Sequence, residues 1–331
     1  MTESNVVFID KDDIPVIDIG SLFTSRPNYS KVGQCLLDAA QGIGFFYVKN
    51  HNIPEKLMTR VASLSKAFFA HDESQKQSVL AQGTHRGLLG FGGAKMAEHF
   101  QPDLKESFIW GADLPPDNPN FVSGNKMFAP NVWPEFMPEL SDTLNEYMAG
   151  ANHCGFHLLK AFAAGLAIDE DYFVQHFDHP ISRGTLIHYP PQPSANLKEN
   201  DDLCSQYGVS PHTDFGTLTL LAQDDTGGLQ VRGRNGEWLT AHPIPNTLVV
   251  NVGDLLARWT NDRFQSTVHA VVNRSGRERY SIVVAVDPNW ETEIKPVVFD
   301  GETPNYEPVK CGEYIQGRFD RSFSYQKPTR S

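Results

Sequence analysis

Two histidines and one aspartate are the residues whose types and spacing could bind a metal in this chain. His212 and Asp214 lie one residue apart within the segment 210–217. In an extended chain, residues two positions apart point to the same face, so both side chains can reach one point in space. His269 interrupts the strand-like run 265–272 and can supply a third ligand from another strand. Together they predict a metal site of two imidazoles and one carboxylate.

Such a ligand set, on one face of an ion, leaves the other coordination positions open. That arrangement is typical of non-haem Fe(II) sites that admit O₂ and a cosubstrate. An isolated His-x-Asp is more often structural, so support is needed elsewhere in the sequence. Arg279 and Ser281 share a face of a later predicted strand, where a guanidinium fork and a hydroxyl suit a carboxylate. Tyr189 can add a phenol from another strand.

The elements that position these residues divide into a helical first half and a stranded second half. Apolar spacing predicts helices at 31–41, 57–69, 135–165, 169–177 and 311–323. Short apolar or branched segments predict strands at 14–19, 44–48, 185–189, 217–222, 228–231, 238–241, 247–252, 267–272 and 279–286. The regular spacing of the later strands favours an antiparallel sandwich or barrel.

We expect a single α+β domain over residues 1–331, with a mainly β core. No Gly-, Ser- or charge-rich linker separates the two halves, and bare sheet faces need a covering layer. Within this domain we expect a mostly helical N-terminal region at 1–180, a core at 181–300 that carries the metal site, and a C-terminal segment at 301–331.

Composition limits the class of partner. The net charge of −12 over 331 residues argues against a nucleic-acid or anionic-membrane surface, because both need clustered Lys and Arg. No apolar window is long enough for a membrane span, and no signal peptide is visible. Four widely separated cysteines, Cys35, Cys154, Cys204 and Cys311, favour reduced thiols. We therefore expect a cytoplasmic protein that acts on a small molecule, without nucleic-acid or membrane partners.

Several ordered segments carry a resemblance to a known family. They are His212-Thr213-Asp214, Gly227-Gly228-Leu229-Gln230-Val231, Asn251-Val252-Gly253-Asp254, Ser266-Thr267-Val268-His269 and Arg279-Tyr280-Ser281, preceded by Ile14-Pro15-Val16-Ile17-Asp18, Lys105-Glu106-Ser107-Phe108 and Tyr189-Pro190-Pro191. Over nearly its whole length, the chain resembles the isopenicillin N synthase-like family of 2-oxoglutarate/Fe(II)-dependent dioxygenases.

The resemblance implies a double-stranded β-helix, or jelly roll, flanked by helices. It implies Fe(II) held by His212, Asp214 and His269, with 2-oxoglutarate bound through Arg279, Ser281 and Tyr189. With O₂, such an enzyme would hydroxylate, desaturate or cyclise a small organic molecule. Candidate contacts to that substrate are Phe215, Arg86, Phe91, Phe108, Trp110 and Phe319.

Two alternative functions stay open on the sequence. One is an isopenicillin N synthase-type oxidase that uses no 2-oxoglutarate and directs Arg279 and Ser281 at the substrate's own carboxylate. The other is a non-catalytic metal or ligand sensor. A second histidine pair, His153 and His157, has metal-pair spacing on a predicted helix, but the zinc-protease pattern needs Glu where Cys154 stands. We interpret that pair as structural.

Overall fold

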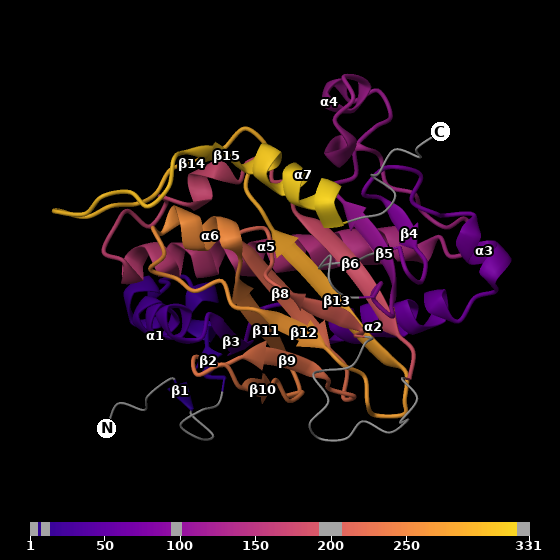
Figure 1. Ribbon diagram of the computed structural model, residues 1–331, viewed down its shortest axis with the longest axis horizontal. Helices are drawn as coiled ribbons and strands as arrows, with labels where there is room; N and C mark the ends of the chain where they lie inside the picture. Colours follow the sequence, from indigo (N-terminus) through magenta and orange to yellow (C-terminus); the bar gives the residue numbers. More distant parts are fainter. Residues whose placement is uncertain (1–5, 8–13, 94–100, 192–206, 323–331) are drawn as a thin grey trace.

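The computed structural model describes residues 6–7, 14–93, 101–191 and 207–322 (Figure 1). Its strands are β1 Val6–Val7, β2 Val16–Asp18, β3 Phe45–Lys49, β4 Gly87–Leu89, β5 Glu106–Gly111, β6 Arg183–Tyr189, β7 Val209–His212, β8 Leu218–Gln223, β9 Leu229–Arg232, β10 Trp238–Thr240, β11 Thr247–Val252, β12 His269–Val271, β13 Arg279–Val286, β14 Glu293–Ile294 and β15 Val309–Lys310. Its α-helices are α1 Tyr29–Gly42, α2 Glu55–Phe69, α3 Glu73–Gln77, α4 Pro119–Val122, α5 Glu139–Gly165, α6 Asp254–Trp259 and α7 Cys311–Ser322.

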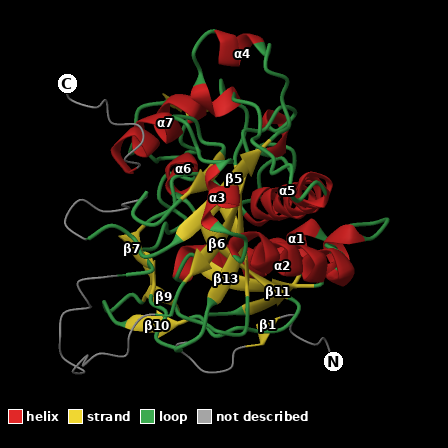
Figure 2. Ribbon diagram, turned by 90° about the vertical axis from the view of Figure 1, so that its right-hand side faces the viewer, coloured by secondary structure: helices red, strands yellow, loops and turns green. Residues whose placement is uncertain are grey.

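Two sheets form the β core. The larger sheet has the order β1-β2-β3-β11-β8-β13-β6-β5-β4, and the smaller has the order β10-β9-β12-β7. Residues of both sheets line one cavity between them. Figure 2 shows the smaller sheet on one side of the larger sheet and the helices α1, α2 and α5 on the other. This confirms the expected α+β fold, a jelly roll flanked by helices.

The helical layer covers the outer face of the larger sheet. Helix α5 begins with Glu139 and Asp142 in its first turn, where acidic side chains favour the positive end of the helix dipole. Its predicted apolar face is buried and packs against β13, β6 and β8. Helices α1 and α5 approach closely at Gly33, where any Cβ would meet the backbone of Ala161. One buried apolar cluster includes both Ile17 and Phe319, so the two halves share a core.

The inner face of the larger sheet follows the two-residue period of its strands. In β6, Ile187 and Tyr189 face the cavity, whereas His188 between them faces the helices. The antiparallel register places Arg279 of β13 opposite Tyr189. The cavity therefore receives alternate side chains from neighbouring strands in register.

The element predictions need correction at one predicted helix and at several elements that were not predicted. The segment 169–177 forms turns and a short 3₁₀ helix, Val174–His176, because Oδ1 of Asp169 accepts from the backbone of Asp171 and closes a turn. Strands β1, β4, β5, β7, β14 and β15 were not predicted, and neither were helices α3, α4 and α6. Cys204 and Phe323 lie outside the described residues.

None of the helices in the described part of the chain combines the length and apolar character that a bilayer crossing requires.

Candidate metal centre

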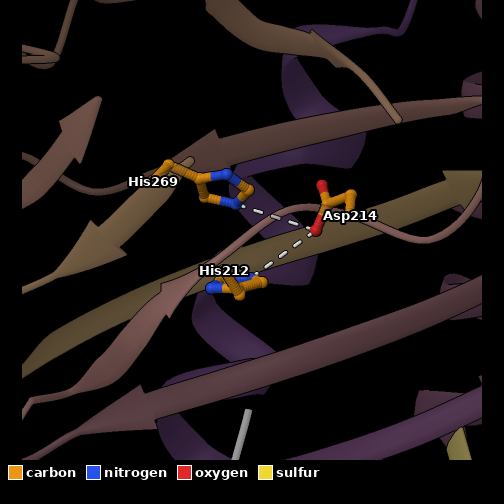
Figure 3. A group of neighbouring side chains, drawn as sticks. All are labelled: His212, Asp214 and His269. Atoms are coloured by element: carbon orange, nitrogen blue, oxygen red, sulfur yellow. Dashed lines mark ion pairs between the residues drawn. The ribbon is translucent and has the colours of Figure 1, made fainter. Parts of the chain in front are cut away.

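Two paired strands bring the histidines together. His212 ends β7 and His269 begins β12, and the antiparallel register places them directly opposite each other. Their ring centroids are 4.3 Å apart. Asp214 follows on the turn after β7, and the backbone N–H of Asp254 holds that turn by donating to the Asp214 carbonyl at 2.8 Å. Figure 3 shows the three side chains converging.

The ligating atoms of this triad already face one point. Oδ1 of Asp214 lies 3.6 Å from Nε2 of His212 and 3.7 Å from Nε2 of His269. Nδ1 of His212 donates to the Ser210 carbonyl at 2.7 Å, and Nδ1 of His269 donates to the Thr267 carbonyl at 3.1 Å. Because a carbonyl can only accept, each Nδ1 carries the proton and each Nε2 presents its lone pair.

The protonation states suit metal binding at neutral pH. Burial alone would raise the pKa of the Asp214 carboxyl, but His269 and His212 hold that pKa well below its usual range. Burial and the neighbouring His212 lower the pKa of His269 to about 4. The site therefore presents a carboxylate and a neutral imidazole, which are the forms that bind a divalent metal.

The donor set fits Fe(II), because two imidazoles and one carboxylate leave open positions for O₂ and a cosubstrate. Across the described ranges, no other group of three His, Cys, Asp or Glu side chains comes within metal-binding distance. The pair on α5 is packed as a structural pair: Nδ1 of His157 lies 2.8 Å from the Tyr29 hydroxyl, and the rings of His153 and His157 contact Phe23.

Arg279 is a buried cation with an incomplete set of partners. Its side chain is fully buried, with Nε donating to the Gly227 carbonyl at 2.5 Å and Nη1 to Oγ of Ser281 at 3.4 Å. Nη2 has no hydrogen-bond partner among the described residues. Leaving a buried guanidinium N–H unpaired is costly, and a ligand carboxylate would satisfy it.

Tyr189 separates Arg279 from the cavity. The guanidinium lies 4.5 Å above the centroid of the Tyr189 ring. Tyr189 lines the cavity, together with Leu229 and Val271, whereas Arg279 and Ser281 lie just behind this wall. The structure thus brings Tyr189, Arg279 and Ser281 together, with Tyr189 stacked on the guanidinium.

The candidate substrate contacts divide into two sets. Phe319 lines the cavity, and Phe215 lines an adjoining lobe that also includes Asp214. Phe108 and Trp110 lie on the opposite face of β5 and pack in the core, because alternate residues point to opposite faces. The other two also lie away from the cavity wall: Arg86 donates to the Met127 carbonyl, and Phe91 is 53% exposed.

Sequence reasoning missed four residues of this site. Lys105, Arg183 and His85 line the cavity, and Asn251 donates to Asp214 at 2.8 Å. Burial and the nearby arginines lower the pKa of His85 to about 3, so this imidazole is neutral. The position of each of these side chains in the site depends on contacts with residues that are distant in the sequence. The two-residue period of β5 and β6 could have indicated Lys105 and Arg183, once the inner face was known.

Comparisons with known proteins agree with this geometry. The family model for the 2OG-Fe(II) oxygenase superfamily matches residues 171–288, and that for the non-haem dioxygenase in morphine synthesis N-terminal region matches residues 14–136. The 2-oxoglutarate-Fe(II) type oxidoreductase hxnY of Emericella nidulans is 31% identical over 319 residues, covering 93% of this chain and 90% of that protein. The chain belongs to the 2-oxoglutarate/Fe(II) oxygenases.

Two further relatives extend the comparison for this oxygenase. A rice homoarginine-6-hydroxylase is 31% identical, covering 91% of this chain and 95% of its own. A solved Neurospora crassa structure, in complex with alpha-KG (2-oxoglutarate) and thymine, is 30% identical with a TM-score of 0.81, covering 95% of this chain and 98% of that one. The predicted family, reaction class and cofactors are confirmed: the enzyme uses Fe(II), 2-oxoglutarate and O₂ to oxidise a small organic molecule.

Proposed function

We propose that His212, Asp214 and His269 hold the Fe(II) of this dioxygenase. We propose also that Arg279, with Ser281 and Tyr189, holds the distal carboxylate of 2-oxoglutarate. The observation that carries the second assignment is the unpaired Nη2 of the buried Arg279, next to the cavity that reaches the triad. Bound together, Fe(II) and 2-oxoglutarate supply the oxidising chemistry that attacks a C–H bond.

The chain's own residues orient the cosubstrate and keep water away. Asn251 fixes the Asp214 carboxylate, and the backbone carbonyls of Ser210 and Thr267 fix the two imidazoles. Apolar side chains of both sheets, including Leu221, Leu229, Val249, Val271 and Val283, line the cavity. Such dry walls protect a reactive centre and confine it to the substrate.

Hydroxylation, desaturation and cyclisation of the substrate are all compatible with this site. The rice relative is named for homoarginine, and the Neurospora structure contains thymine. These molecules differ in charge and shape, so we carry over the reaction class and not the substrate. The substrate would enter near Phe319 and Phe215, which line the cavity and its adjoining lobe.

The visible spectrum of the anaerobic Fe(II) protein with 2-oxoglutarate tests the assignment. Chelation should produce a weak metal-to-ligand charge-transfer band, which His212→Ala abolishes and Arg279→Ala weakens. Arg277→Ala is the matched control, because Arg277 lies two residues away, is exposed and pairs with Asp225 on the surface. Equal bands in the Arg279 and Arg277 variants would contradict the cosubstrate assignment.

We further propose that residues 1–331 form one domain and that the protein resides in the cytoplasm. Both halves contribute to one buried cluster. Cys35, Cys154 and Cys311 are free thiols, as expected in a reducing compartment. A single cooperative thermal transition and complete thiol labelling of the freshly isolated, denatured protein would support these two proposals.

A further inference from the structure

We propose that Lys105 binds an oxygen acceptor of the primary substrate, a carboxylate or a carbonyl carried on an otherwise apolar body. The inference rests on the proposed function, because it assigns a second ligand to the cavity that holds 2-oxoglutarate. It names a substrate anchor that is separate from the iron ligands and from Arg279.

The strand register separates Lys105 from the cosubstrate anchor. Strand β5 pairs with one edge of β6, where Glu106 lies opposite His188, and Lys105 immediately precedes Glu106. Strand β13 pairs with the other edge of β6, where Arg279 lies opposite Tyr189. The two cations therefore flank the Tyr189 end of β6 from opposite sides, with Lys105 on the cavity wall and Arg279 behind Tyr189. This separation lets one hold 2-oxoglutarate while the other holds a different molecule.

Among the residues that the structure describes, no hydrogen-bond acceptor lies close to the ammonium group of Lys105. This ammonium pairs with Oδ2 of Asp103 at 3.7 Å, which is beyond hydrogen-bond distance. Oδ1 of Asp103 accepts from the N–H and the hydroxyl of Ser210, at 2.9 and 2.7 Å, and Oδ2 has no hydrogen-bond partner among the described residues. The Lys105 side chain is only 11% exposed and lines the cavity.

A shielded ammonium with three N–H donors gains most from a ligand that can accept hydrogen bonds. The nearby Asp103 carboxylate balances the charge of Lys105 without occupying its donors. For this reason both a carboxylate and a neutral carbonyl suit the position. The shared chemistry is an oxygen acceptor, and the two sources can be separated by experiment.

The rest of the cavity argues against a cationic substrate. Its other cation, Arg183, is already paired with Asp287 at 3.0 Å and stacks 4.8 Å from the Phe319 ring centroid. Among the described residues that line the cavity, Asp214 is the sole acid, and it belongs to the metal triad. An amine or a guanidinium would find no free carboxylate here, and a substrate like homoarginine is therefore disfavoured.

Three probes of similar size test this inference: phenylacetate, phenylacetamide and phenethylamine. Their binding to the anaerobic Fe(II)–2-oxoglutarate enzyme is measured by ligand-observed NMR titration. We expect the acid and the amide to bind at least about tenfold more tightly than the amine, since the oxygen of each accepts a hydrogen bond from one charged donor. An acid that binds about tenfold more tightly than the amide would identify a carboxylate, and equal binding would identify a carbonyl.

Variants of Lys105 show whether this residue is responsible. Lys105→Met should weaken the binding of phenylacetate by about tenfold or more, and Lys105→Arg should restore most of that affinity. Lys295→Met is the matched control, because Lys295 is exposed and lies away from the cavity. The inference is overturned if the amine binds as tightly as the acid, if no probe binds at millimolar concentration, or if Lys105→Met leaves the acid unaffected.

The charge-transfer band separates failure of this inference from failure of the proposed function. We expect Lys105→Met to retain the band with 2-oxoglutarate at wild-type affinity. If Lys105→Met weakens the band as Arg279→Ala does, Lys105 serves the cosubstrate and the substrate anchor is overturned, while the oxygenase assignment stands. If the wild-type protein gives no band, the cosubstrate site itself fails, whatever the probes show.

Discussion

Nδ2 of Asn251 donates a 2.8 Å hydrogen bond to Oδ2 of Asp214, while Oδ1 of the same carboxylate faces both His212 and His269. Asn251 lies in β11, where it pairs with Thr219 of β8, so a central part of the sheet fixes the amide. The hydrogen bond sets the rotation of the carboxylate and leaves one oxygen directed at the metal position.

Replacing Asn251 by Ala should therefore weaken Fe(II) binding by about 10–100-fold, the usual effect of losing a group that orients a metal ligand. The measurement is an anaerobic Fe(II) titration followed by the charge-transfer band. Asn120→Ala is the control, because Asn120 is exposed on the short helix α4. Equal Fe(II) affinity in the two variants would show that Asn251 does not orient Asp214.

Asp103 positions His212 through the backbone of β7. It accepts two hydrogen bonds from Ser210, whose carbonyl in turn accepts from Nδ1 of His212. Ser210→Ala removes one of these bonds and should cost about 1 kcal/mol, whereas Asp103→Ala leaves two buried donors unpaired and should cost about 2–3 kcal/mol or more. Urea unfolding measures both values, and Asp117→Ala on the surface is the control. Similar stability of Asp103→Ala and the control would contradict this role.

A buried charge network lies behind the cavity wall. His188 contacts Oε1 of Glu106 at 2.7 Å through Nδ1 and Oε2 of Glu278 at 2.5 Å through Nε2, and Lys76 donates to Glu106 at 2.9 Å. Burial alone would lower the pKa of His188, but the hydrogen bonds to the two carboxylates raise it above its ordinary 6.5. The folded protein therefore favours the imidazolium.

A raised histidine pKa stabilises the fold below the unfolded pKa, and this stability is lost as the pH rises through the folded pKa. We expect His188→Gln to lower Tm relative to wild type at about pH 6 and the difference to shrink at about pH 9. Thermal melts of both proteins at the two pH values give the comparison. A difference that stays constant, or grows with pH, would show that His188 is not held as a cation.

Gly216 allows the turn after Asp214 to approach a buried carboxylate. A Cβ at this position would collide with Asp287, which accepts from the Thr217 N–H at 2.9 Å and pairs with Arg183 at 3.0 Å. Gly216→Ala should destabilise the protein by about 1–3 kcal/mol and weaken Fe(II) binding, because the turn must shift. Gly90→Ala is the control, since its Cβ would meet nothing within 4 Å. Matching unfolding midpoints for the two variants would refute this packing argument.

The triad was predictable because its signals are local. The His212 and Asp214 spacing, the strand-like run around His269, and the Arg279 and Ser281 pair all depend on a two-residue period, which the sequence shows directly. The spacing of the short strands that carry these residues predicted an antiparallel sandwich or barrel, and the family resemblance implied the jelly roll. Arg279 is fully buried, which suits the carboxylate receptor that its pairing with Ser281 predicted.

The parts that were missed depend on partners distant in the sequence. Strand β5 begins at Glu106, a charged residue whose type alone indicates an exposed position. In the folded protein it is buried, because Lys76 and His188 pair with it. Both faces of β5 are buried, one against helices and one beside the cavity. The sequence alone therefore does not tell whether Phe108 or Ser107 faces the cavity. The anchoring of Asp214 by Asn251 likewise joins separate strands.

The most direct test of the central claim is anomalous diffraction from crystals grown anaerobically with Fe(II) and 2-oxoglutarate. We predict an iron peak bonded to Nε2 of His212, Nε2 of His269 and Oδ1 of Asp214, with the distal carboxylate of 2-oxoglutarate paired to Arg279. An iron peak at another position, such as His153 and His157, or 2-oxoglutarate bound away from Arg279, would contradict the account.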